Sequence, residues 1–153
     1  MRSNDTSSGY MHSEDGLFIP DKIFIERAAE CYPLTAQILD RCPGVPVVRV
    51  DDAAVLIRRY RDDPPRGFDG KRSLLLCCNR GRFFEACPGT GRDYRCCLYL
   101  ILNTGLGCPL ACTYCVLQVY LNNPFLTLFV NRDDMFQELE RSARIAPGRF
   151  LRV

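Results

Sequence analysis

Short apolar runs recur along the chain, and turn-forming residues separate them. Five of these runs lie at residues 22–26, 45–50, 73–78, 98–103 and 126–130. Runs of this length, rich in β-branched and large apolar residues, are typical of buried strands. The pattern therefore predicts short strands, and the continuously apolar run at residues 73–78 fits a buried one.

Two intervals in the first half of the chain are predicted to be helical. The first interval has apolar positions with helical spacing at Ala28, Ala29, Leu34, Ile38 and Leu39. Pro33 lies among them and either breaks this helix or begins its second half. Asp51 and Asp52 are placed to cap a second helix that continues to Arg59. Each predicted helix lies between two predicted strands.

Two more helices are predicted in the second half, at residues 113–121 and 133–144. The later helix is amphipathic, with Met135, Phe136, Leu139 and Ala143 on one face. Its acidic residues lie at the first turn and its arginines at the last, as the helix dipole favours. Strands alternating with helices predict an α/β fold.

The final run, residues 149–153, reads as a strand that is cut off. A complete α/β barrel needs about 250 residues, so we expect the chain to be a truncated piece of one. Three regions are predicted. Residues 1–16 form a polar, disordered tail, residues 17–95 a small α/β segment, and residues 96–153 the start of a barrel.

Composition excludes some classes of protein. The chain has 153 residues and a net charge of +2, which gives no electrostatic signature of a nucleic-acid binder. The first 16 residues lack the apolar core of a secretion signal, and no apolar run is long enough to cross a membrane. The ten cysteines are therefore expected to be reduced thiols or metal ligands in a reducing cytoplasm.

Three cysteines carry the clearest chemical signal. Cys108, Cys112 and Cys115 stand at positions i, i+4 and i+7 of a loop that Gly105 and Gly107 open. Structural zinc sites usually have four ligands, whereas three thiolates can hold three corners of an iron–sulfur cube. The fourth iron would then be open to a small molecule. The two glycines either allow close approach of such a group or only turn the chain.

The residues around this loop are similar to those of the spore photoproduct lyase family of radical S-adenosylmethionine (SAM) proteins. The resemblance rests on the cysteine triplet and on the segments Cys87-Pro88-Gly89-Thr90, Tyr94-Arg95-Cys96-Cys97, Leu102-Asn103, Val116-Leu117-Gln118-Val119-Tyr120-Leu121-Asn122-Asn123-Pro124 and Leu126-Thr127-Leu128-Phe129-Val130-Asn131. It implies the N-terminal portion of a partial (β/α) barrel, preceded by a small α/β segment.

The resemblance also implies a cofactor set. Cys108, Cys112 and Cys115 would ligate a [4Fe–4S] cluster, and its open iron would bind SAM. Reductive cleavage of SAM then yields a deoxyadenosyl radical, which in this family repairs thymine dimers in DNA. Tyr114 matches an aromatic residue near the SAM adenine; the alternative is a ring that packs into the core.

Further partners follow from the same resemblance. They are an electron donor such as ferredoxin or flavodoxin and, in the full-length protein, DNA; no membrane is involved. Val116 stands where the family has a tyrosine thought to relay hydrogen. The family's hydrogen-donating cysteine would lie in the strand that begins near Val153. No catalytic residue is assigned within the chain.

Two other readings stay open. The chain could be a zinc-binding interaction module, in which Cys87 or Cys96 completes the set of Cys108, Cys112 and Cys115, or an inactive truncated product. Cys96 and Cys97, like Cys77 and Cys78, are adjacent in predicted strands and so point to opposite faces. We interpret these four as small buried apolar residues; the alternative is that Cys96 or Cys97 faces the barrel interior near the cluster. Cys31 and Cys42 are assigned no function.

Overall fold

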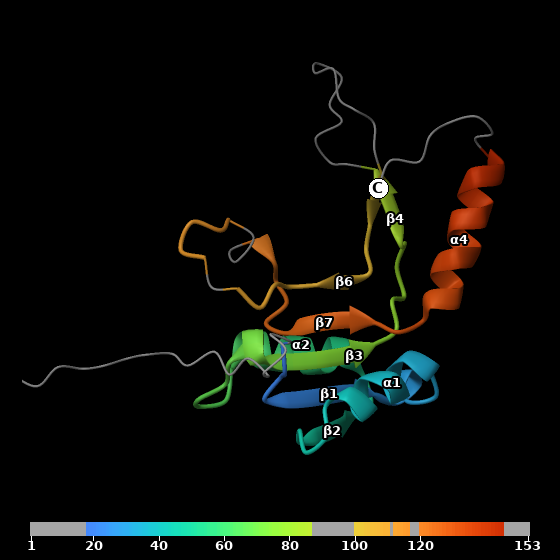
Figure 1. Cartoon of the computed structure of the whole chain (residues 1–153). Helices are drawn as coiled ribbons and strands as arrows, with labels where there is room; N and C mark the ends of the chain where they lie inside the picture. The colour runs from blue at the N-terminus through green and yellow to red at the C-terminus, as the bar shows by residue number, and fades with distance from the viewer. Residues whose placement is uncertain (1–17, 87–99, 111, 117–119, 146–153) are drawn as a thin grey trace, which may run out of the picture.

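A computed structural model describes residues 18–86, 100–110, 112–116 and 120–145 of the chain (Figure 1). The predictions for residues 1–16 and for Cys87, Cys96 and Cys97 lie outside these residues. The principal sheet has five strands in the order β2-β1-β3-β7-β6. They are β1 (Lys22–Glu26), β2 (Val47–Val50), β3 (Ser73–Cys77), β6 (Gly105–Leu106) and β7 (Leu126–Phe129).

The first four strands in that order are parallel. β1 pairs with both β2 and β3, and β3 pairs with β7, all in parallel. Only β6 runs antiparallel, against β7 at the edge of the sheet. The predicted α/β class is therefore confirmed. Strands from both sides of the predicted boundary near residue 95 contribute to this one sheet, since β7 joins β3.

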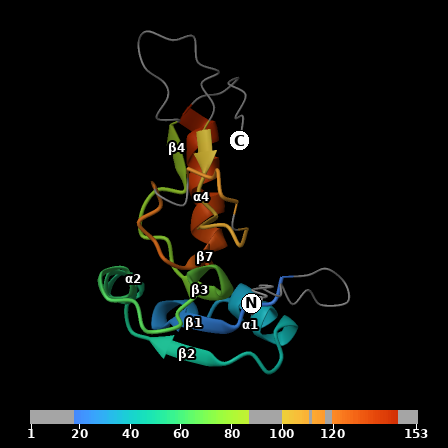
Figure 2. The same cartoon turned by 90° about the vertical axis from the view of Figure 1, so that its left-hand side faces the viewer.

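Helices cover both faces of the sheet. α1 (Pro33–Arg41) and α2 (Ala53–Asp62) connect β1 to β2 and β2 to β3. Figure 2 shows them on opposite sides of β1 and β3. Pro33 occupies the first turn of α1, after a short 3-10 helix η1 (Arg27–Ala29), so it begins the second half of the predicted helical stretch.

Asp52 caps α2, as the sequence predicted. Its carboxylate accepts hydrogen bonds from the amides of Ala54 at 2.7 Å and Val55 at 3.2 Å. These amide bonds, followed by a bond from Arg80, hold the pKa of the Asp52 carboxyl below its ordinary value. Capping of this kind satisfies amide groups that have no partner within the helix.

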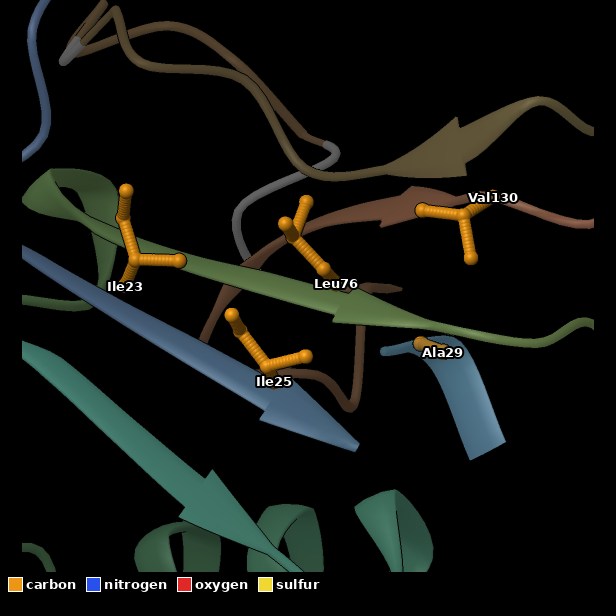
Figure 3. Close-up of a cluster of buried hydrophobic side chains, with 5 residues drawn as sticks. All are labelled: Ile23, Ile25, Ala29, Leu76 and Val130. Carbon is orange, nitrogen blue, oxygen red and sulfur yellow. The ribbon is translucent and has the colours of Figure 1, made fainter. Parts of the chain in front are cut away.

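The two central strands are apolar along their length because each is covered on both faces. One cluster of buried side chains lies on the α1 face, and Figure 3 shows its members: Ile23, Ile25, Ala29, Leu76 and Val130. A second cluster lies on the α2 face and contains Phe24, Ala53, Leu75, Cys77 and Phe125. Alternation along each strand sends successive side chains to the two clusters.

Cys77 is one of these core residues, which confirms its interpretation as a buried apolar side chain. Burial, with a smaller contribution from nearby Glu26, raises the pKa of the Cys77 thiol to about 12. Cys78 is half-buried and packs against the opposite cluster. None of the described cysteines forms a disulfide.

A buried carboxylate joins the carboxyl ends of the central strands. Glu26 ends β1 and is 1% exposed. It accepts hydrogen bonds from the amide of Ala53 at 3.3 Å, the amide of Cys78 at 3.1 Å and the guanidinium of Arg80 at 2.6 Å. Arg80 also reaches the Asp52 carboxylate at 3.2 Å. One side chain thereby ties together the ends of β1 and β3 and the start of α2.

The remaining elements form a smaller unit beside the sheet. β4 (Phe84–Ala86) and β5 (Leu100–Leu102) pair antiparallel. α4 (Arg132–Ile145) runs alongside β4 (Figure 1), and its Glu138 carboxylate accepts the amides of Phe83 at 2.8 Å and Phe84 at 3.1 Å. The predicted strand at residues 98–103 and helix at 133–144 are present in their described parts.

The predicted helix at residues 113–121 is absent over its first residues and present at Tyr120. Thr113, Tyr114 and Val116 lie in turns, whereas Tyr120 is helical and donates its amide to the Val116 carbonyl oxygen at 3.3 Å. Leu121 lies outside the helix, and residues 117–119 are not described. The absence of helix at the start has a physical reason: Tyr114 and Val116 are 89% and 60% exposed, so they offer no buried face to stabilise one.

Candidate metal centre

The cysteine loop leaves the principal sheet at β6 and returns to it at β7. β6 packs so closely on β7 that a Cβ atom at Gly105 would overlap the carbonyl oxygen of Thr127. Gly107 has a φ of 92°, in the left-handed region that favours glycine. Gly105 therefore allows the backbone of β6 to pack closely against β7, and Gly107 allows the chain to turn.

A cavity of about 560 Å³ lies between this loop and the sheet. Its cysteine-loop side is lined by Gly107, Cys108, Leu110 and Cys115, and its opposite side by the segments at Phe68–Lys71 and Leu121–Leu126. Cys108 is exposed and Cys115 half-buried. The structure thus places two of the three predicted ligands at one cavity.

The third predicted ligand lies elsewhere. Cys112 is half-buried and does not contribute to the described lining of the cavity. Its carbonyl oxygen accepts the amide of Cys115 at 3.1 Å. In the described part of the chain, no three histidine, cysteine, aspartate or glutamate side chains are gathered as they are around a metal ion. The three sulfurs therefore do not converge in this arrangement.

The donor set is nevertheless of the kind that an iron–sulfur cluster takes. Three cysteines lie within one loop, and two of them line a cavity large enough for a small ligand. The chemistry of the donors fits a cluster, but the three side chains are not gathered among the described residues, so cluster binding would require the loop to rearrange. The assignment of the three cysteines as ligands stays a prediction.

Tyr114 projects away from the protein interior. Its side chain is 89% exposed and is not among the described residues that line the cavity. The alternative role considered for it, packing into the core, is therefore absent from this structure. Its predicted position near a bound adenine stays a prediction.

Aromatic side chains form the floor of the cavity. Phe125 is 1% exposed, and its ring centre lies 5.2 Å from that of Phe24 and 5.2 Å from that of Phe68. Asn123 fixes the chain before β7, because its side chain accepts the Phe125 amide at 3.0 Å and donates to the Thr127 hydroxyl at 2.8 Å. Phe125 therefore belongs both to the cavity lining and to the core.

The 3-10 helix η2 (Gly70–Arg72) forms the polar side of the cavity. Asp69 caps it by accepting the Lys71 amide at 2.9 Å. The Lys71 ammonium reaches across to the cysteine loop and donates to the carbonyl oxygens of Cys108, at 3.3 Å, and of Leu110. Sequence reasoning did not single out Lys71, and only its rarity, as one of two lysines, could have drawn attention to it.

Solved structures of spore photoproduct lyase match this fold. A cysteine-to-alanine variant matches with a TM-score of 0.65 at 20% identity, over 88% of this chain and 38% of that chain. The enzyme complexed with dinucleoside spore photoproduct matches with a TM-score of 0.64 at 20% identity, with the same coverage. The chain has the fold of part of spore photoproduct lyase.

A third match is a double variant with bound AdoMet and dinucleoside spore photoproduct, with a TM-score of 0.62 at 22% identity. The chain spans 38% of the length of these proteins. No protein-family model matches the sequence, and no curated protein matches it at a significant level. The resemblance predicted from the sequence is therefore confirmed at the level of the fold. None of the described helices combines the length and apolar character that crossing a membrane requires.

Close backbone packing behind the cavity gives a first testable prediction. A Cβ atom at Gly70 would overlap the carbonyl oxygen of Pro124. Gly70→Ala is expected to lower the free energy of unfolding by about 1–3 kcal/mol, because backbone must shift on both sides of the contact. Urea denaturation followed by circular dichroism measures this loss.

Gly81→Ala is the matched control, since a Cβ atom there would meet only the Asn79 side chain, at an ordinary 3.4 Å. Its effect is expected to stay within about 0.5 kcal/mol. Equal effects of the two substitutions would show that η2 does not press against Pro124.

Proposed function

We propose that this chain is the cluster-binding part of a radical SAM protein of the spore photoproduct lyase type. One observation carries the proposal: a chain with the fold of part of that enzyme has three cysteines on one loop, two of them at a single cavity. Cys108, Cys112 and Cys115 would ligate a [4Fe–4S] cluster at this loop. Cluster assembly would require the three side chains to come together.

The residues around the cavity would then have different roles in binding the cluster and its ligand. When bound, the cluster supplies the electron that cleaves the sulfonium bond of SAM. The thiolates of the loop hold three corners and leave one open. Phe68 and Phe125 keep one wall of the cavity apolar and exclude water there, while Asp69 and Lys71 supply its charged groups.

The identity of the substrate is part of the proposal. The matched enzymes are solved with dinucleoside spore photoproduct and with AdoMet. By this likeness we propose SAM as cosubstrate, a thymine lesion in DNA as substrate of the longer protein, and a ferredoxin or flavodoxin as electron donor. Val116 has no hydroxyl group, so it supplies no hydrogen relay of the tyrosine type.

Anaerobic reconstitution with iron and sulfide tests the proposal. We expect a brown protein with about four irons and four sulfides per chain, and an electronic spectrum that changes when SAM is added. A colourless protein that retains one zinc ion would instead support the interaction module. A chain that takes up neither metal would contradict both assignments.

A further inference from the structure

Lys71 is held in place by the backbone around it. Its amide is capped by Asp69, and Gly70 beside it packs directly on Pro124. The Ser73 hydroxyl donates to the Asp69 carbonyl oxygen at 2.8 Å and closes the turn that leads into β3. Lys71 therefore projects from a fixed point at the edge of the principal sheet.

From this point the Lys71 side chain extends to the cysteine loop. The ammonium donates to the carbonyl oxygens of Cys108 and Leu110, which are 37 and 39 residues away along the sequence. An ammonium has three donors, so two carbonyls leave one donor for a further partner.

The other lysine of the chain, Lys22, is in a more exposed environment than Lys71. Lys22 is exposed at the start of β1, and its ammonium lies 6.0 Å from the ring centre of Phe24. Lys71 is half-buried and lines the cavity that Cys108 and Cys115 also line. Its positive charge thus lies at the same cavity as two cysteines whose thiols would carry negative charge when they bind metal.

We propose that Lys71 is a positioning residue, which fixes the cysteine loop through the Cys108 and Leu110 carbonyls and sets a positive charge at the cavity that Cys108 and Cys115 line. The first part concerns the chain alone. The second part rests on the proposed function, because it concerns the loaded cluster. A nearby cation stabilises the reduced, more negative cluster and so raises its reduction potential.

Hydrogen exchange on the metal-free chain tests the first part. In Lys71→Met, peptides that contain Cys108, Leu110 and Cys115 are expected to exchange about tenfold faster, because charge-assisted hydrogen bonds to the loop are lost. Lys71→Arg should restore slow exchange, and Lys22→Met is the matched control with no change. Unchanged exchange in Lys71→Met would overturn the positioning role. If that variant does not fold, Lys71→Gln takes its place.

Redox titration of the reconstituted chain tests the second part. Lys71→Met should bind iron but show a more negative midpoint potential, and Lys71→Arg should return the potential to the wild-type value. A potential that does not move would overturn the role of the charge. If the wild-type chain takes up no cluster, the proposed function fails, whereas the exchange experiment still decides whether Lys71 holds the loop.

Discussion

Cys112→Ala is expected to reduce the iron content of the reconstituted chain from about four atoms to near zero. Two thiolates, Cys108 and Cys115, would remain, and two protein ligands do not hold a cubane cluster stably. Iron and sulfide analysis after desalting, with the visible absorption of the cluster, measures the loss. The same result is expected for each of the other two cysteines of the loop.

Cys42→Ala is the matched control for this experiment. Cys42 is also half-buried, but it lies at the end of α1 and packs against the core, where burial raises the pKa of its thiol. The control should keep its full iron content. Full iron content in Cys112→Ala would remove that residue from the ligand set and leave the proposed cluster without its third corner.

Glu26→Ala is expected to lower the free energy of unfolding by about 2–4 kcal/mol. The substitution leaves the amides of Ala53 and Cys78 without their acceptor in a buried position and removes one of the two carboxylate partners of Arg80. A buried amide that loses its acceptor bears the full cost of desolvation. Urea denaturation under reducing conditions measures the change.

Glu30→Ala is the control for the buried carboxylate. Glu30 pairs with Arg49 at 3.0 Å, but both side chains are largely open to solvent. Exposed pairs contribute little, so the expected loss is about 0.5 kcal/mol. A loss in Glu26→Ala as small as that of the control would mean that water enters and replaces the carboxylate.

Local patterns in the sequence were enough to predict most of the elements. The runs at residues 22–26 and 73–78 are apolar on both faces because β1 and β3 have neighbours on both sides and helices above and below. The start of α2 could be predicted from Asp52, because a capping carboxylate accepts hydrogen bonds from amides only two and three residues further along the chain. The predicted helix after the cysteines is absent over its first residues because Tyr114 and Val116 are exposed and have nothing to pack against.

The cysteine triplet and the fold could likewise be recognised from the sequence, since ligand spacing and flanking segments are local features. Which groups meet around the cavity was decided only by the tertiary structure. Lys71 reaches Leu110 because β3 and β7 are neighbours, and Glu26 meets Arg80 because β1 and β3 end at the same edge. Contacts between residues so far apart in the chain depend on strand order, and no periodicity within a single segment encodes that order.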